Sequence, residues 1–242
     1  MMPAHKRPAL EPLLAALNRR MLRKHFHRVH AGGLEHVRAL DRTRPIIIYG
    51  NHSCWWDGLM EFFFSADVFR FDAYLMMEER QLRRYQFFRW IGAFSVNRDS
   101  PREALRSVQY AASLFDRPGR VLWIYPQGVM LPNDVRPLGF YGGTARLMEL
   151  VDGAQILPVA HRYEFLSEQR PEAFSLFGPP VPAAGSQGRR ATTARLERVL
   201  TELLDSLRCS IGSGQTEGFV SLLEGSSSVN VRYDQMRGAG QR

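Results

Sequence analysis

The sequence predicts an α/β protein with a mostly parallel central sheet covered by helices. Apolar segments of strand length alternate along the chain with longer segments of helix length, which is the pattern of parallel strands joined by helical crossovers. The first such strand, at residues 45–49, is apolar throughout, as expected for a strand buried on both faces. Hydrophobic residues make up 45% and charged residues 23% of the 242 residues, which fits a globular chain and excludes a disordered one.

Residues 1–44 form a basic segment in front of this sheet. They carry ten lysines and arginines against three acidic residues, so this segment alone accounts for +7 of the chain's net charge of +8. Within it, residues 9–26 are predicted to form an amphipathic helix, because apolar residues recur at helical spacing opposite a mostly basic face. These apolar residues are Leu10, Leu13, Leu14, Leu17 and Met21. Such a helix either lies in a lipid headgroup layer or packs on the protein's own core, and both alternatives are open at this point.

The remaining elements follow from residue 45 onward. The helix at residues 101–115 has the clearest start, since Ser100 can cap it, Pro101 takes its first position and Glu103 completes a capping box. Further strands are predicted at residues 71–77, 93–96, 121–125, 156–160 and 173–177, and further helices at 58–69, 78–90, 142–150 and 192–208. A folded domain is expected over residues 45–209, followed by a Gly/Ser-rich, loosely ordered tail at 210–242.

Several classes of protein are excluded by patterns that the sequence lacks. No stretch approaches the roughly 18 apolar residues of a membrane-spanning helix, and residues 1–30 contain no apolar core of a secretory signal. Two cysteines, Cys54 and Cys209, are too few for a disulfide framework, so we expect a reducing, cytosolic setting. There is neither a cysteine cluster nor a His-Glu-x-x-His motif, so we expect no metal and no cofactor.

A candidate catalytic pair follows directly on the first predicted strand. Ligands of open α/β sheets bind beyond the carboxyl ends of the strands, which is where His52 lies. A histidine titrates near neutral pH and can act as a base. Asp57, five residues later and after a turn into a helix, can reach back to fix the tautomer of the imidazole and stabilise its charged form. We therefore predict a base at His52 that is oriented by Asp57.

The same segment offers no dedicated nucleophile facing His52. Ser53 and Cys54 are its chain neighbours, and adjacent side chains on an extended segment point apart. His52 is therefore expected to activate a hydroxyl group on a substrate, which describes direct acyl transfer to an alcohol. An alternative in which Cys54 is itself acylated would need a base that faces the thiol in space. A serine hydrolase is disfavoured because the Gly-x-Ser-x-Gly elbow is absent.

Three further segments end predicted strands with residues suited to a binding site. Residues 92–98 finish on Arg98, a fixed cation, residues 125–128 read Tyr-Pro-Gln-Gly, and residues 156–159 contain a proline. Together with the His-x4-Asp segment, these blocks resemble, in order and spacing, the four motifs of the lysophospholipid (1-acylglycerol-3-phosphate) acyltransferase family. The resemblance covers residues 45–160.

The resemblance implies a reaction and a set of site residues. Residues 45–209 would form an acyltransferase domain that moves a fatty acyl group from an acyl-CoA or acyl-carrier-protein thioester to a lipid hydroxyl. His52 would be the general base, Asp57 would orient it, and Arg98 would bind the phosphate of the acceptor. The other substrate-binding residues implied by the motifs are Asn51, Pro126, Gln127 and Gly128.

The third block departs from the family pattern in two respects. Gln127 stands where the family usually has glutamate, and Val129-Met130 stand where Thr-Arg or Ser-Arg is common. An arginine there would bind the acceptor phosphate with charge assistance. Arg136 follows closely enough in the sequence to substitute for it. A lipid hydroxyl without a phosphate, for example on a glycolipid, is therefore an alternative acceptor.

A lipid substrate gives the aromatic and basic residues a functional interpretation beside the structural one. Trp55 and Trp56 either belong to the core or form the wall of an acyl-chain pocket. The helix within residues 9–28 is expected to contact a membrane surface, with the protein peripheral on the cytoplasmic face of that membrane. The high basic charge also suggests a rival class, a nucleic-acid-binding protein. Residues 46–242 carry a net charge of only +1, however, so no nucleic-acid partner is expected.

Overall fold

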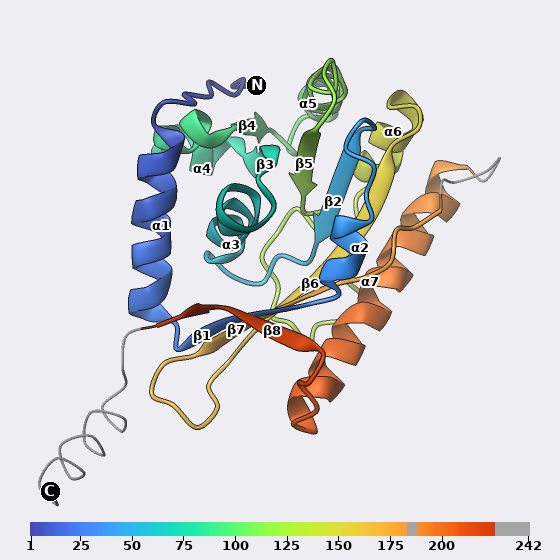
Figure 1. Ribbon diagram of the computed structural model, residues 1–242. Helices are drawn as coiled ribbons and strands as arrows, with labels where there is room; N and C mark the ends of the chain where they lie inside the picture. Colours follow the sequence, from blue (N-terminus) through green and yellow to red (C-terminus); the bar gives the residue numbers. More distant parts are fainter. Residues whose placement is uncertain (183–187, 226–242) are drawn as a thin grey trace, which may run out of the picture.

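The computed structural model describes residues 1–182 and 188–225, and these residues form an eight-stranded sheet with helices on both faces (Figure 1). The strand order is β4-β3-β5-β2-β6-β7-β1-β8. Neighbouring strands from β4 to β6 are parallel, β7 runs antiparallel to β6, and β8 runs antiparallel to β1, so the predicted mostly parallel α/β fold is confirmed. The strands are β1 (Arg28–Gly32), β2 (Ile46–Gly50), β3 (Asp72–Glu78), β4 (Ala93–Val96), β5 (Arg120–Ile124), β6 (Gln155–Glu164), β7 (Glu172–Phe177) and β8 (Phe219–Glu224).

Strand β2 lies between two hydrophobic cores, one on each face of the sheet. Ile46 and Ile48 belong to the core that includes side chains of α1, α3 and η1, whereas Ile47 and Tyr49 belong to the core formed with α5, α6 and α7. All of β2 is buried, which explains its continuous apolar sequence. The helices are α1 (Glu11–His25), α2 (Leu34–Arg38), α3 (Asp57–Phe63), α4 (Glu79–Arg84), α5 (Pro101–Ser113), α6 (Gly143–Leu150) and α7 (Arg189–Gly212), with a π-helical turn η1 (Phe64–Phe69) and a 3-10 helix η2 (Gln86–Ile91).

The N-terminal segment is more than the helical appendage that the sequence predicts. After α1, strand β1 enters the sheet, where it pairs in parallel with β7 and antiparallel with β8, and the short helix α2 follows it. Pattern analysis missed β1 because its five residues include two polar side chains and a glycine, and because both of its partners lie far away in the sequence. Residues 1–44 are therefore part of the same folded body as the predicted domain at 45–209.

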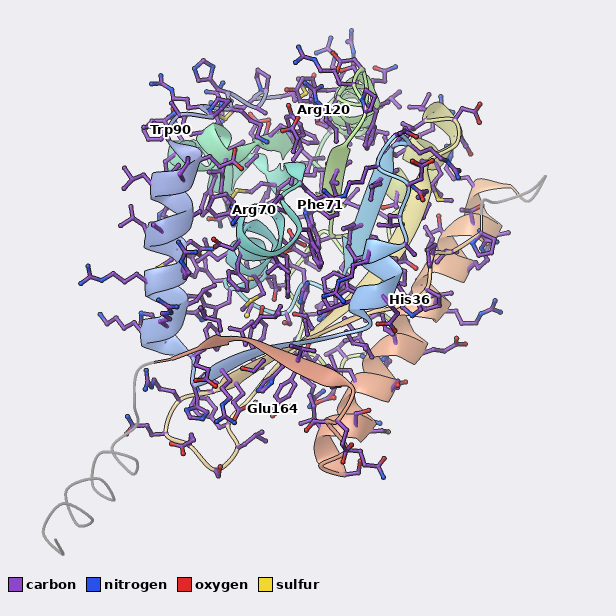
Figure 2. The ribbon with its side chains drawn as sticks, in the orientation of Figure 1. His36, Arg70, Phe71, Trp90, Arg120 and Glu164 are labelled. Carbon is purple, nitrogen blue, oxygen red and sulfur yellow. The ribbon has the colours of Figure 1, made fainter. Side chains whose placement is uncertain are left out.

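Helix α1 packs on α3 and η1 through a face that coincides only in part with the predicted one. Its buried residues are Ala15, Asn18 and Leu22, while Leu13 and Leu17 are 59% and 54% exposed. Small Ala15 allows a close approach to α3 and η1, and the Asn18 side chain donates a hydrogen bond to the carbonyl of Leu59 at 2.9 Å. The N-terminal end of α1 lies beside Trp90, as Figure 2 shows. The predicted leucine face is thus divided between packing and solvent.

The C-terminal segment also differs from the prediction of a loosely ordered tail that starts at residue 210. Helix α7 continues to Gly212, and residues 219–224 form β8, the edge strand beside β1. Leu223 of β8 is buried in the core, and this burial holds the short apolar strand in place. The rest of the predicted tail, residues 226–242, lies outside the described residues. No helix in the described ranges is long and apolar enough to span a bilayer.

Candidate active site

The site lies at the edge of the sheet where the parallel strands end. His52 follows β2, Gly128 follows β5, and Glu78 is the last residue of β3, beside Val96 at the end of β4. Because these strands are parallel neighbours, residues that are far apart in the sequence meet at one edge, as expected for ligand sites of open α/β sheets.

The predicted base and carboxylate form a direct pair. Nδ1 of His52 lies 2.8 Å from Oδ2 of Asp57, whose side chain is completely buried at the start of α3. The backbone N–H groups of Ser53 and Cys54 donate to the same oxygen at 2.7 Å and 2.9 Å. The turn between His52 and Asp57 therefore closes around the carboxylate and holds the two side chains in register.

The other carboxylate oxygen has a partner that the sequence did not indicate. The hydroxyl of Tyr163 donates to Oδ1 of Asp57 at 2.7 Å. Burial raises the pKa of Asp57, but the hydrogen bonds from His52 and Cys54 outweigh it and hold that pKa below its usual 3.8. An ionised carboxylate can only accept, so Nδ1 of His52 is the protonated nitrogen, and Nε2 of the neutral ring remains as the acceptor.

Gln127 and Tyr125 hold His52 from behind. The backbone N–H of His52 donates to Oε1 of Gln127 at 2.7 Å, and the imidazole stacks on the Tyr125 ring with centroids 4.3 Å apart and planes at 8°. Gln127 is buried and does not line the cavity beside His52. Gln127 therefore positions the backbone of His52, which an amide can do because the donor is a backbone N–H, and its predicted role in substrate binding stays a prediction.

Asn51 and Pro126 also hold the loops and do not line that cavity. The Asn51 side chain accepts from the backbone N–H of His161 at 2.7 Å and donates to its carbonyl at 3.0 Å, which ties the end of β2 to β6. The carbonyl of buried Pro126 accepts from the N–H of Tyr141 at 2.9 Å. The structure thus gives both residues contacts that position the backbone.

A cavity of about 350 Å³ opens beside His52, within the size range of small-molecule sites. Its wall is mostly apolar and comes from α3, β3, α4, η2, the ends of β4 and β5, and the loop after β5. The apolar lining residues are Trp55, Leu59, Leu75, Met76, Met77, Phe88, Val96, Ile124, Val129 and Met130. The charged and amide side chains on the wall are Glu78, Arg80, Gln81 and Arg98. A ligand with an apolar chain and a polar end would match this division.

Arg98 and Arg136, the two cations predicted to bind the acceptor phosphate, lie in different places. Arg98 lines the cavity and lies against Gly128, since a Cβ at that glycine would be 3.0 Å from Cδ of Arg98. Arg136 does not reach the cavity: its guanidinium donates to Asp205 at 2.8 Å and to the carbonyl of Asn133 at 2.7 Å. The prediction that Arg136 substitutes for the missing motif arginine is therefore corrected, because α7 supplies the carboxylate that holds its side chain elsewhere.

The two tryptophans also separate. Trp55 is 48% exposed and lines the cavity, which agrees with the pocket-wall interpretation. Trp56 does not line it and instead packs edge-on against Phe26, with ring centroids 4.9 Å apart, and against His25 of α1. Trp56 thus packs the C-terminal end of α1 against the turn that joins His52 to Asp57. It lies outside the cavity wall in which it was predicted.

Burial raises the pKa of two other titratable groups near the pair. It raises the pKa of Cys54 to about 12, and the charge of Asp57 adds to the effect. The thiol lies 3.7 Å from Oδ1 of Asp57, and its raised pKa disfavours the thiolate that the cysteine alternative needs. Burial likewise raises the pKa of Glu61, one turn further along α3, well above 4.5. Burial therefore disfavours a second charge beside Asp57.

No cluster of three or more histidine, cysteine, aspartate or glutamate side chains that could hold a metal ion occurs in the part of the chain that the structure describes.

Comparison with known proteins agrees with the fold and with the family. No curated protein matches the chain. The structure is similar to the crystal structure of the 1-acyl-sn-glycerophosphate (LPA) acyltransferase, PlsC, from Thermotoga maritima, with a TM-score of 0.60, 15% identity, and coverage of 82% of this chain and 80% of that chain. The sequence profile described as Acyltransferase matches residues 28–162, which is more than half of the chain and begins at β1. The predicted family is thus confirmed, and the chain belongs to the acyltransferase family.

Proposed function

We propose that the protein transfers a fatty acyl group from an acyl thioester to the hydroxyl of a lysophospholipid. The observation that carries this proposal is the His52–Asp57 pair at 2.8 Å beside a largely apolar cavity. A base alone would suit many reactions, but an apolar wall with charged side chains at one part of it suits a substrate with a long chain and a polar headgroup.

In the proposed mechanism, Nε2 of His52 takes the proton of the acceptor hydroxyl while the oxygen attacks the thioester carbonyl. The buried Asp57 carboxylate stabilises the imidazolium that forms. Collapse of the tetrahedral intermediate breaks the C–S bond, and the imidazolium returns the proton to the departing thiolate. The products are an ester and a free thiol, with His52 neutral again.

The donor is proposed to be acyl-CoA or acyl-carrier protein, and 1-acylglycerol 3-phosphate is the reference acceptor. The family and the named activity of the Thermotoga protein support this acceptor, as does the position of Arg98 on the cavity wall. A second candidate is a lipid hydroxyl without a phosphate, such as that of a glycolipid. It is favoured by Val129 and Met130, which line the cavity where family members have an arginine, and by the distance of Arg136 from it.

The test is mass spectrometry of the lipid products after incubation with mixed acyl donors and a panel of lysophospholipid and glycolipid acceptors. We expect a mass increase of one acyl group on an acceptor, with release of free thiol, and product formation that is slower by about 10²-fold or more with His52→Ala. Acyl transfer at the wild-type rate in this variant would contradict the mechanism. Hydrolysis of the donor alone would indicate that water, rather than a lipid, is the acceptor.

The protein is further proposed to bind the cytoplasmic face of a membrane peripherally, through residues 9–28. Leu13 and Leu17 are exposed one turn apart on α1, with basic Arg20 and Lys24 exposed in the following turns. An exposed apolar pair next to cations matches the chemistry of an anionic bilayer surface.

Co-sedimentation with vesicles that contain anionic phosphatidylglycerol tests this contact. The double variant Leu13→Glu with Leu17→Glu should bind more weakly, while Leu105→Glu, a matched exposed leucine on α5, should bind as the wild type does. Equal sedimentation of the two would contradict the role of α1. Salt-sensitive binding to DNA or RNA without vesicle binding would favour the rival nucleic-acid class.

A further inference from the structure

The cavity beside His52 contains an ion pair that the motif analysis did not anticipate. Glu78 ends β3, Arg98 follows β4 by two residues, and the parallel pairing of Glu78 with Val96 brings the two side chains together. Oε1 of Glu78 lies 3.7 Å from Nη2 of Arg98, and both side chains line the cavity. A carboxylate therefore accompanies the very cation that would bind an acceptor phosphate.

This ion pair is loose on both sides. Within the described ranges, neither the Glu78 nor the Arg98 side chain makes a hydrogen bond, and Nε of Arg98 is buried without a partner. Arg98 is kept in place by its packing over Gly128, where a Cβ would lie 3.1 Å from Nη1. The oxygens of Glu78 and the donors of Arg98 are therefore free to bind a ligand, and the pair can open around a polar headgroup without losing a hydrogen bond.

The charges of the two side chains restrict which headgroup fits. A phosphomonoester that binds Arg98 would bring its negative charge next to the Glu78 carboxylate, and like charges in a partly buried site repel. An ammonium or hydroxyl group would instead donate to Glu78, while the phosphodiester or another oxygen of the same headgroup accepts from Arg98. Arg80, on the same wall, adds a second cation for that oxygen.

We propose that Glu78 is a specificity-determining residue that selects acceptors whose headgroup donates hydrogen bonds, over acceptors that end in a bare phosphomonoester. The inference rests on the proposed function and refines its acceptor. Two lipid sources share this chemistry: zwitterionic lysophospholipids with an ammonium group, and monoacylated glycolipids with sugar hydroxyls. In both cases Glu78 accepts from the headgroup and takes no part in the proton transfer at His52.

The test compares three acceptors with one acyl donor: lysophosphatidylethanolamine, a monoacylated glycosylglycerol and 1-acylglycerol 3-phosphate. For each protein preparation, kcat/KM is measured for an acceptor whose headgroup donates hydrogen bonds and for 1-acylglycerol 3-phosphate. The ratio of these two values is the selectivity. A fraction of unfolded protein cancels in this ratio, so a variant that folds poorly still reports selectivity.

For the wild type we expect kcat/KM to be roughly tenfold or more higher for an acceptor whose headgroup donates a hydrogen bond than for 1-acylglycerol 3-phosphate. This factor corresponds to the free energy of one hydrogen bond to a charged group. Glu78→Gln should reduce that ratio, and Glu78→Lys should reverse it in favour of 1-acylglycerol 3-phosphate. Faster turnover of lysophosphatidylethanolamine would identify the ammonium source, and faster turnover of the monoacylated glycosylglycerol would identify the sugar source. Asp72→Asn, the same loss of charge at the other end of β3, should leave the ratio unchanged.

Two results would overturn the inference and can be told apart. If the wild type prefers 1-acylglycerol 3-phosphate and Glu78→Gln leaves the ratio unchanged, Glu78 does not select the headgroup, while acyl transfer itself stands. If the wild type acylates none of the acceptors, with a signal equal to that of His52→Ala, the proposed function fails and the inference fails with it.

Discussion

The two ends of the cavity are built in opposite ways. At one end, Asp57 is fully buried and accepts from the side chains of His52 and Tyr163 and from two backbone N–H groups. At the other end, Glu78 and Arg98 are partly exposed and contact each other only at 3.7 Å. The end proposed to carry the chemistry is held by many short contacts, whereas the end proposed to face the headgroup has unused hydrogen-bonding capacity.

This difference has a physical reason. A base must keep one tautomer and one orientation through every turnover, which requires a saturated hydrogen-bond network in a buried setting. In a headgroup site, the side chains must exchange their contacts with one another for contacts with the ligand. This exchange costs little free energy only where the side chains are solvated and loosely held. Substitutions can therefore disturb one end without the other.

Replacement of the base should give the largest effect. His52→Ala removes the proton acceptor, and kcat should fall by about 10²- to 10⁴-fold. The fold should persist, because Gln127 binds the backbone N–H at position 52 and not the imidazole. Steady-state kinetics and a thermal unfolding curve of the same sample check both statements; wild-type turnover would remove His52 from the mechanism.

The buried surroundings of the catalytic end should appear in the pH dependence of stability. Burial lowers the pKa of His161 from 6.5 to about 4. Between these pH values the unfolded chain binds a proton that the folded protein does not, so the free energy of unfolding rises with pH. The difference amounts to about 3 kcal/mol over that window.

His161→Gln should lack this contribution, so its stability relative to wild type should improve as the pH falls from about 6.5 to 4. Urea unfolding at several pH values measures the difference. Parallel curves for wild type and His161→Gln would show that His161 takes up its proton over the same pH range in the folded and the unfolded protein, so that its pKa is not lowered.

Loss of the tyrosine contact should weaken the same end more mildly. Tyr163→Phe removes one hydrogen bond to the Asp57 carboxylate and leaves those from His52 and from the backbone N–H groups of Ser53 and Cys54 in place. We expect kcat to fall by about tenfold, the effect of one hydrogen bond to a charged group, with little change in the KM of the acceptor. An altered KM with unchanged kcat would assign Tyr163 to substrate binding instead.

The headgroup end can be disturbed through the glycine beneath Arg98. Gly128 has φ +64, and a Cβ there would contact Cδ and Nη1 of Arg98. Gly128→Ala should displace the guanidinium and raise the acceptor KM severalfold, besides a backbone cost of roughly 1–2 kcal/mol in stability. Gly139→Ala is the matched control, because Gly139 has φ +70 but nothing near its Cβ position. It should lose similar stability and keep the wild-type KM.

Residues that act through local spacing were predictable from the sequence. His52 and Asp57 are joined by one turn, and the rule that ligands bind at strand ends placed them correctly at the edge of the sheet. Arg98 was placed in the cavity by the same rule. The apolar run at 46–49 indicated a strand buried on both faces, because both cores of the molecule contact it.

Residues that act across the fold were not predictable in this way. Tyr163 was missed because the strand was predicted to end at residue 160, whereas β6 continues to Glu164. Arg136 was expected to replace the arginine missing at Val129-Met130 because it follows them closely in the sequence, but Asp205 on α7 binds it instead. Strands β1 and β8 were missed because each is stabilised mainly by pairing with segments far along the chain.

The sequence by itself determined the α/β class, the order of the parallel strands along the chain and the paired base and carboxylate, since all three depend on periodicity and short spacing. Only the tertiary structure decided which face of α1 is buried, that Gln127 supports His52 from behind, and that Glu78 stands beside Arg98. These outcomes depend on which strands become neighbours in the sheet. Strand order is set by the packing of the whole chain, because backbone hydrogen bonds form equally well between strands that are near or far apart in the sequence.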